Sequence, residues 1–144
     1  MRLSRQKALL LLLVTAIGCS ETTSPKLPAT FALVNINGRP LPTYFAATPG
    51  FTTEVLSAYV SLQPDGTAFW IETRRDGADA VTSISQTFHY TIADGRIELS
   101  SFGTCIGDCT GTYKGDVSKD ALSLVFPNGF VIYNYRLTVD IPVD

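Results

Sequence analysis

The sequence is poor in the residues that most enzymes, metal sites and nucleic-acid-binding surfaces depend on. Its 144 residues include one histidine, one tryptophan, one methionine and three cysteines. There is no run of basic residues, and 11 basic against 13 acidic residues give a formal net charge of −2. Nucleic-acid binding needs a concentrated positive charge, so this class of partner is not expected.

Motifs for catalysis and for metal binding are absent as well. No G-x-S-x-G stretch supplies a nucleophile for the single histidine, His89, which lies on the polar side of an expected strand. No D-x-D-x-D-G calcium loop occurs, and most aspartates lie where turns are expected; the least improbable cation site, a weak one, is the stretch Asp76-Gly77-Ala78-Asp79. We therefore expect no enzymatic activity, no catalytic residues, no bound metal and no cofactor.

Long hydrophobic runs and helical periodicity are also missing. The longest apolar run, Ala8–Ile17, has ten residues, and ten residues of helix span only about 15 Å, half of a bilayer core. Because Arg2, Arg5 and Lys7 precede it, the run is typical of a secretory signal peptide. No helical period follows it, which favours an all-β domain.

The clearest positive pattern is a β-hairpin at Thr82–Ser100. Apolar side chains alternate with polar ones up to Ile92, Asp94-Gly95 supplies a tight turn, and the alternation resumes with Ile97 and Leu99. Similar strands are expected at Thr30–Asn35, Glu54–Gln63, Thr67–Arg74, Thr112–Val117, Leu122–Phe126 and Val131–Leu137. The sequence predicts an antiparallel up-and-down meander of eight to nine strands. Closure into a barrel would remove its edges, and a two-sheet β-sandwich is the alternative.

Aromatic side chains recur along these strands. In Thr67–Arg74, Phe69 and Ile71 share one face, and Trp70, Glu72 and Arg74 share the other. The aromatic set either fills a barrel core or lines a ligand cavity with phenol hydroxyls as polar contacts; its members are Phe69, Phe88, Tyr90, Tyr113, Phe126, Tyr133 and Tyr135.

Two of the three cysteines, Cys105 and Cys109, are separated by three residues in a glycine-containing loop. If they flank a hairpin loop, their Cα atoms are about 4.5–5.5 Å apart, which is within disulfide range. An exported chain permits oxidation, so a disulfide is expected. A metal site or a redox pair is the alternative, although two sulfurs alone do not close a zinc site and C-x-x-C has a shorter spacing.

The third cysteine ends the stretch Ala16-Ile17-Gly18-Cys19, which resembles the bacterial lipobox. The resemblance implies that residues 1–18 are a lipoprotein signal peptide and that Cys19 carries a diacylglyceryl group and an acylated amine. Ser20, which is not aspartate, resembles an outer-membrane sorting signal. Without the leader the chain keeps eight basic and thirteen acidic residues. Anionic lipid would repel such a surface, so membrane contact would depend on the acyl chains.

Three further motifs resemble small bacterial lipoproteins with lipocalin-like domains. They are Leu33-x-x-Ile36-Asn37-Gly38-x-x-Leu41-Pro42, Leu62-x-x-Asp65-Gly66-Thr67 and Gly111-Thr112-Tyr113. The resemblance implies a lipocalin-like barrel over residues 29–140, joined to Cys19 by a tether over residues 19–28. The Gly-x-Trp of true lipocalins is absent, so no ligand is implied.

The expected protein is a monomeric lipoprotein of the bacterial cell envelope, anchored to the outer membrane. In one hypothesis its barrel holds a small apolar or amphipathic ligand. In the other it is a structural or interaction protein that contacts envelope components through its outer face or loops. The volume of the barrel interior separates the two hypotheses.

Overall fold

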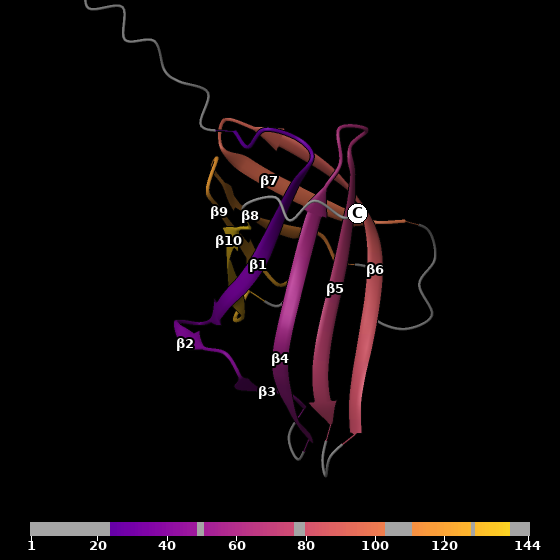
Figure 1. Cartoon of the computed structure of the whole chain (residues 1–144), viewed down its shortest axis with the longest axis vertical. Helices are drawn as coiled ribbons and strands as arrows, with labels where there is room; N and C mark the ends of the chain where they lie inside the picture. The colour runs from indigo at the N-terminus through magenta and orange to yellow at the C-terminus, as the bar shows by residue number, and fades with distance from the viewer. Residues whose placement is uncertain (1–23, 49–50, 77–79, 103–110, 128, 139–144) are drawn as a thin grey trace, which may run out of the picture.

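The computed structural model describes residues 24–48, 51–76, 80–102, 111–127 and 129–138 of the chain (Figure 1). These residues form ten β-strands and no helix. The strands are β1 (Ala29–Ile36), β2 (Arg39–Pro40), β3 (Thr43–Thr48), β4 (Phe51–Leu62), β5 (Thr67–Asp76), β6 (Ala80–Ala93), β7 (Arg96–Ser101), β8 (Tyr113–Val117), β9 (Ala121–Val125) and β10 (Ile132–Leu137). Within these parts of the chain there is no helix long and apolar enough to cross a membrane.

Eight of the strands close into an antiparallel barrel. Their order is β1-β10-β9-β8-β7-β6-β5-β4, and β4 returns to β1 through the ladder from Ala29↔Leu62 to Ala32↔Tyr59. β1 and β10, the first and last of the described strands, pair with each other, and the backbone N–H of Thr138 donates to the carbonyl oxygen of Thr30 at 2.8 Å. The predicted up-and-down barrel is confirmed, and the sandwich alternative is wrong.

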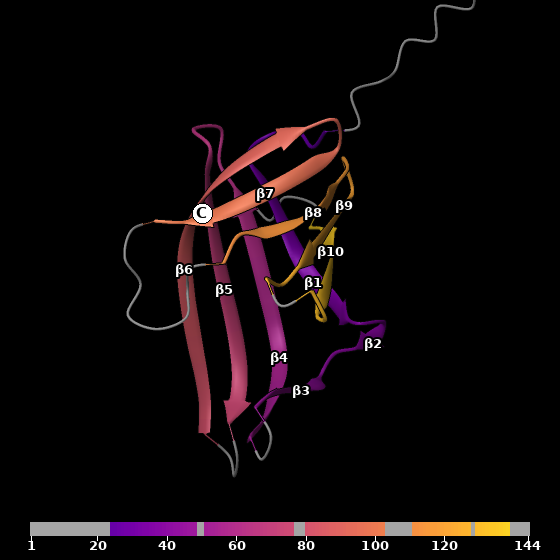
Figure 2. The same ribbon diagram turned by 180° about the vertical axis from the view of Figure 1, so that it is seen from behind.

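Two short strands lie outside the closed ring. The chain leaves the ring after β1 and runs through β2, which pairs with β1, and β3, which pairs with β4. Figures 1 and 2 show β2 beside the end of β1 and β3 beside the end of β4; the long strands β4, β5 and β6 extend past the shorter strands.

Local turn chemistry accounts for much of this topology. Asp94 and Gly95 have φ angles of 51° and 74°, so both central residues of the β6–β7 turn are left-handed, as a tight hairpin with the twist of its strands requires. Asn37 and Gly38, in the turn between β1 and β2, are also left-handed, with φ angles of 51° and 78°. The turns expected at these two sites are present.

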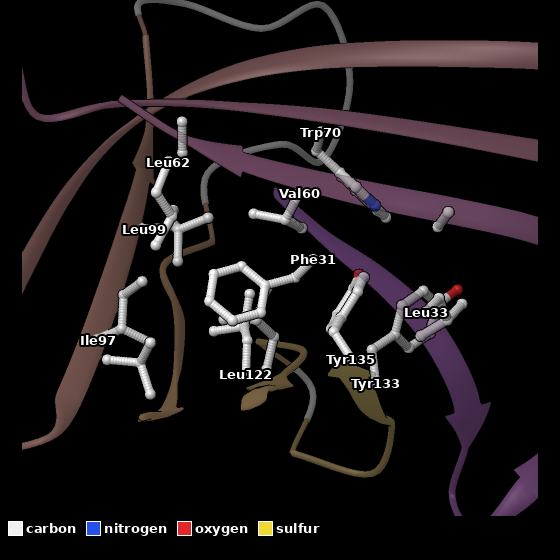
Figure 3. Packing of buried hydrophobic residues seen from close by; sticks show 14 of the residues in the cluster. Phe31, Leu33, Val60, Leu62, Trp70, Ile97, Leu99, Leu122, Tyr133 and Tyr135 are labelled. Carbon is white, nitrogen blue, oxygen red and sulfur yellow. The ribbon is translucent and has the colours of Figure 1, made fainter. Parts of the chain in front are cut away.

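Side chains fill the interior of the barrel (Figure 3). The core contains residues from all eight barrel strands, with Phe31, Val60, Leu62, Phe88, Leu99, Leu122 and Tyr133 among the most completely buried. Between the core rings, a space of about 10 Å³ remains beside Trp70, Phe88 and Tyr113. That volume is close to what a single water molecule needs.

Candidate functional site

The most chemically distinctive part of the interior is an aromatic cluster around Trp70. The indole of Trp70 lies 5.9–6.2 Å, between ring centroids, from the rings of Phe88, Tyr113, Phe126 and Tyr133. Most of these contacts are edge-on, the arrangement that ring quadrupoles favour. Four of the rings come from β5, β6, β8 and β10, and Phe126 directly follows β9, so strand pairing and the period-two alternation bring them together.

A buried carboxylate lies beside this cluster. Glu72 is on the same face of β5 as Trp70 and is only 2% exposed. Its Oε2 accepts a hydrogen bond from the hydroxyl of Tyr133 at 2.9 Å, and its Oε1 pairs with Nη2 of Arg74 at 2.6 Å. Both carboxylate oxygens therefore have a partner, which is the condition under which proteins tolerate a buried charge.

Burial raises the pKa of Glu72 above its usual range, because desolvation outweighs the opposing effects of Arg74 and of the Tyr133 hydrogen bond. The pKa of Tyr133 is raised too, first by burial and then by the negative charge of Glu72. The pKa of Tyr135 is also raised, first by burial and then by electrostatic interaction with Tyr133 and Glu72. The three phenols Tyr113, Tyr133 and Tyr135 therefore stay neutral and can donate hydrogen bonds at any physiological pH.

Three buried polar atoms around the cluster have no hydrogen-bond partner among the described residues: Nε1 of Trp70, Nε of Arg74 and Oε1 of Gln86. Trp70 and Gln86 are direct neighbours across the β5–β6 ladder. Nε1 of Trp70 lies near the Tyr135 hydroxyl without the geometry of a hydrogen bond. Of these three residues, Trp70 lines the space of about 10 Å³, a volume that suits at most one water.

The structure brings together most, but not all, of the aromatic residues singled out from the sequence. Phe88, Tyr133 and Tyr135 are buried, and Tyr113 and Phe126 pack against them. Tyr90 packs against the same core, but its hydroxyl donates to the carbonyl oxygen of Gln63 at 2.6 Å, beside the β4–β5 turn.

Phe69 differs from the expectation for this set. It is 45% exposed on the outer face of the barrel, whereas its neighbour Trp70 is 7% exposed and points inward. Adjacent strand residues point to opposite faces, so only one of the two can join the core. Burying the larger indole forces Glu72 inward with it, and Arg74 and Tyr133 offset that cost.

Other candidate residues lie apart from the cluster or outside the described residues. His89 is exposed on the outer face, where its ring stacks on Phe102 with 3.5 Å between centroids. Asp76 accepts a hydrogen bond from the Thr53 hydroxyl at 2.7 Å. Within the described ranges no three His, Cys, Asp or Glu side chains gather closely enough to hold a metal ion. Cys19, Cys105, Cys109 and Asp79 lie outside those ranges, so the lipid attachment and the disulfide stay predictions.

Sequence reasoning did not single out Glu72, Arg74 or Gln86 as candidate site residues. One signal was available: Glu72 and Arg74 share the face of the only tryptophan. Arg75 lies on the opposite face, where its Nη1 pairs with Oε2 of Glu54 at 2.9 Å.

No family model matches the chain, and neither the curated proteins nor the solved structures contain a significant match to it.

The raised pKa of Glu72 predicts how stability depends on pH. A carboxyl group with a higher pKa in the folded state binds its proton more tightly there, so its ionisation destabilises the fold. We expect the stability of the native protein, relative to a Glu72→Gln variant, to be highest below about pH 4.5 and to fall as pH rises through the folded-state pKa. Urea unfolding at pH 4 and pH 7, followed by the fluorescence of Trp70, measures this difference.

Glu98→Gln is the matched control, because Glu98 is an exposed residue on the outer face. Its stability relative to the native protein is expected to change little between the two pH values. If the stability of the native protein relative to Glu72→Gln is the same at pH 4 and pH 7, or is greater at pH 7, the pKa of Glu72 is not raised by folding.

Proposed function

We propose that the chain is a bacterial envelope lipoprotein whose barrel is a rigid interaction module, making its contacts through the outer face and loops. The observation that carries this proposal is the packed interior, where the space beside Trp70 is about 10 Å³, far below the roughly 300–1,000 Å³ of typical small-molecule pockets. Exposed apolar side chains, by contrast, are frequent on the outside, including Tyr44, Tyr59, Phe69, Ile71 and Phe130.

The proposed anchor is Cys19, at the end of the lipobox-like stretch Ala16-Ile17-Gly18-Cys19. Several acyl chains on one residue supply the two or more hydrophobic signals that stable anchoring needs. The polar segment Ser20–Pro28 would then hold the barrel away from the bilayer, since the first strand begins at Ala29. A barrel tethered in this way keeps its whole outer surface available to other envelope components.

A second candidate, a small amphipathic ligand inside the barrel, is favoured by the unpartnered polar atoms near Trp70. Nε1 of Trp70 and Nε of Arg74 would donate to an acceptor on such a ligand, and Gln86 would accept. The aromatic side chains would have to move apart to admit it, because the present space is water-sized.

Native mass spectrometry of the full chain, purified from the envelope of its own host, separates the two candidates. The interaction proposal expects the mass of the acylated chain alone or with a second protein, and no stoichiometric small molecule. A small-molecule mass that is present in the native protein and lost in a Gln86→Leu variant would contradict the proposal and establish the ligand candidate.

The anchor has its own test. Cys19→Ser removes the thiol that would carry the diacylglyceryl group, so we expect the variant either to leave the membrane fraction or to remain unprocessed with its leader attached. Fractionation followed by intact-mass measurement reads out both results. Ser20→Ala, which keeps the thiol, is the control. A Cys19→Ser protein that is processed normally and is equally membrane-bound would contradict the anchor.

A further inference from the structure

The barrel is closed, but the sheet still has an unpaired edge. Among the described strands β3 pairs with β4 alone, and Figures 1 and 2 show no strand on its other side. In an antiparallel pair, alternate residues direct their backbone N–H and C=O groups away from the partner, so β3 presents a row of such groups outward. Its sequence, TYFAAT, has no charge and no internal proline, two of the devices that protect an exposed edge; the ladder with β4 shifts register only near the end of the strand, between Ala46 and Thr48.

A groove of about 440 Å³ lies beside the start of this edge strand. Ile36 and Val131 are buried and contribute apolar surface to it, whereas Tyr44 and Phe130 are 66% and 83% exposed. Aromatic side chains beside a free strand edge form a pocket for alternate side chains of an added strand, and such pockets give specificity to strand addition.

The backbone that carries Phe130 is held in place by Asn37. The side-chain amide Nδ2 of Asn37 donates to the carbonyl oxygen of Phe130 at 3.2 Å, and its Oδ1 accepts from the backbone N–H of Ile132 at 2.8 Å. The backbone N–H of Asn37 also donates to the carbonyl oxygen of Ile132 at 2.8 Å. An exposed aromatic residue on a backbone fixed in this way loses little conformational entropy when a partner covers it.

The groove also carries an uncompensated positive charge. Arg39 is exposed in its lining and forms no ion pair with any described residue. No carboxylate lines the groove, and the nearby Glu54, on the strand that pairs with β3, is already paired with Arg75. Charge complementarity therefore favours an acidic occupant.

A second copy of the chain fits this site less well. Antiparallel pairing of two β3 edges about a twofold axis would offer Arg39 no carboxylate from the added strand, because TYFAAT contains none. The chain without its leader also has five more acidic than basic residues, so two copies repel each other.

We infer that the free edge of β3 is a strand-addition site for an extended segment of another protein, one that alternates apolar side chains and carries at least one carboxylate. The segment extends the sheet past β3, seats an apolar side chain between Tyr44 and Phe130, and pairs its carboxylate with Arg39. This inference rests on the proposed interaction function, for which it names the surface and the chemistry of the partner.

Selection of a random decapeptide library against the full chain in lipid nanodiscs tests the inference. We expect the enriched peptides to share apolar alternation and an aspartate or glutamate. The best peptide is then synthesised in two forms, N-methylated at alternate residues along one edge or along the other. Only one form should lose affinity, by about tenfold or more, because an added strand uses one of its edges.

Protein variants add a second readout by fluorescence anisotropy. Arg39→Glu should weaken binding of the acidic peptide about tenfold, and Phe130→Ser should weaken it comparably. The matched control is Phe69→Ser, another exposed phenylalanine, which pairs with Ser61 outside the stretch of β4 that β3 covers; it should leave affinity unchanged.

Four results would overturn the inference: no enriched pattern, equal binding of both methylated peptides, full binding to Arg39→Glu, or a dimer in sedimentation velocity that Tyr44→Lys dissociates. Photo-crosslinkers placed at Phe69 and at Phe102, away from the β3 edge, test the interaction function in the intact envelope separately from the β3 site. A specific partner captured there, with no binding at β3, would leave the interaction function standing without this site.

Discussion

Replacement of Phe88 by alanine is expected to lower the free energy of unfolding by about 3–5 kcal/mol, a large share of the stability of a small domain. Phe88 is 2% exposed, and its ring lies 6.2 Å from that of Trp70 and 5.4 Å from that of Tyr113, between centroids. The loss combines buried apolar surface with the cavity left behind. Urea denaturation followed by circular dichroism measures it independently of Trp70 fluorescence, which the missing ring would also alter.

The neighbouring residue supplies the control. Thr87 is exposed on the opposite face of β6, so Thr87→Ala is expected to change stability by well under about 1 kcal/mol. Equal effects at the two positions, or a larger loss at Thr87, would mean that β6 presents its faces the other way round. The aromatic residues would then form an outer patch.

Gly115→Ala is expected to be nearly as damaging, although it adds only one methyl group. A Cβ on this central residue of β8 would overlap the carbonyl oxygen of Ser123 and lie 2.7 Å from its carbonyl carbon. These are backbone atoms of the adjacent strand, so the clash is relieved only by separating β8 from β9, where Gly115 pairs with Leu124. We expect a loss of about 3 kcal/mol, at the upper end of the usual cost of overpacking.

The adjacent residue, Asp116, is the control for this variant. Its side chain is 69% exposed and pairs with that of Arg96 at 3.0 Å, an exposed ion pair of the kind worth at most about 1 kcal/mol. Asp116→Ala should therefore leave the midpoint of urea unfolding almost unchanged. If both variants unfold at the same urea concentration, the close approach of β8 and β9 at Gly115 is not a constraint on the fold.

The sequence was sufficient for the hairpins, because these depend on local signals; closure into a barrel was expected only because it removes the edges of a long meander. Asp94-Gly95 marks its turn by residue type alone, and the alternation of β6 and β10 carries through to their burial. β3 left no such signal, because Phe45–Thr52 has no regular period.

A β-bulge makes the burial of β4 differ from the pattern of its sequence. Leu56, Ala58, Val60 and Leu62 share one parity in the sequence, which predicts one common face. The ladder between β4 and β5 shifts register between Val55 and Ser57. The extra residue reverses the alternation, so Val55 is fully buried and Leu56 only partly. The residue types around position 56 do not predict this change of register.

The interior site was hidden for a different reason. Whether Phe69 or Trp70 faces inward depends on rings that other strands bring to the same place. The stability of a buried Glu72 depends on Tyr133, which is 61 residues away in the sequence. Periodicity within one strand shows that two faces differ, but it does not show which face meets the rest of the fold.

The pairing of β1 with β10 has a consequence for how the molecule forms. The hydroxyl of Thr138 donates to the carbonyl oxygen of Thr30 across a sequence separation of 108 residues, next to the ladder that completes the ring. Until β10 has been synthesised, β1 and β9 each lack a neighbour, so folding waits for nearly the whole chain and is expected to be slow, in the range of milliseconds to seconds.

The same adjacency means that a short linker between residues 24 and 138, with a new opening at an exposed turn such as Asp94-Gly95, should yield a permuted chain with the same barrel.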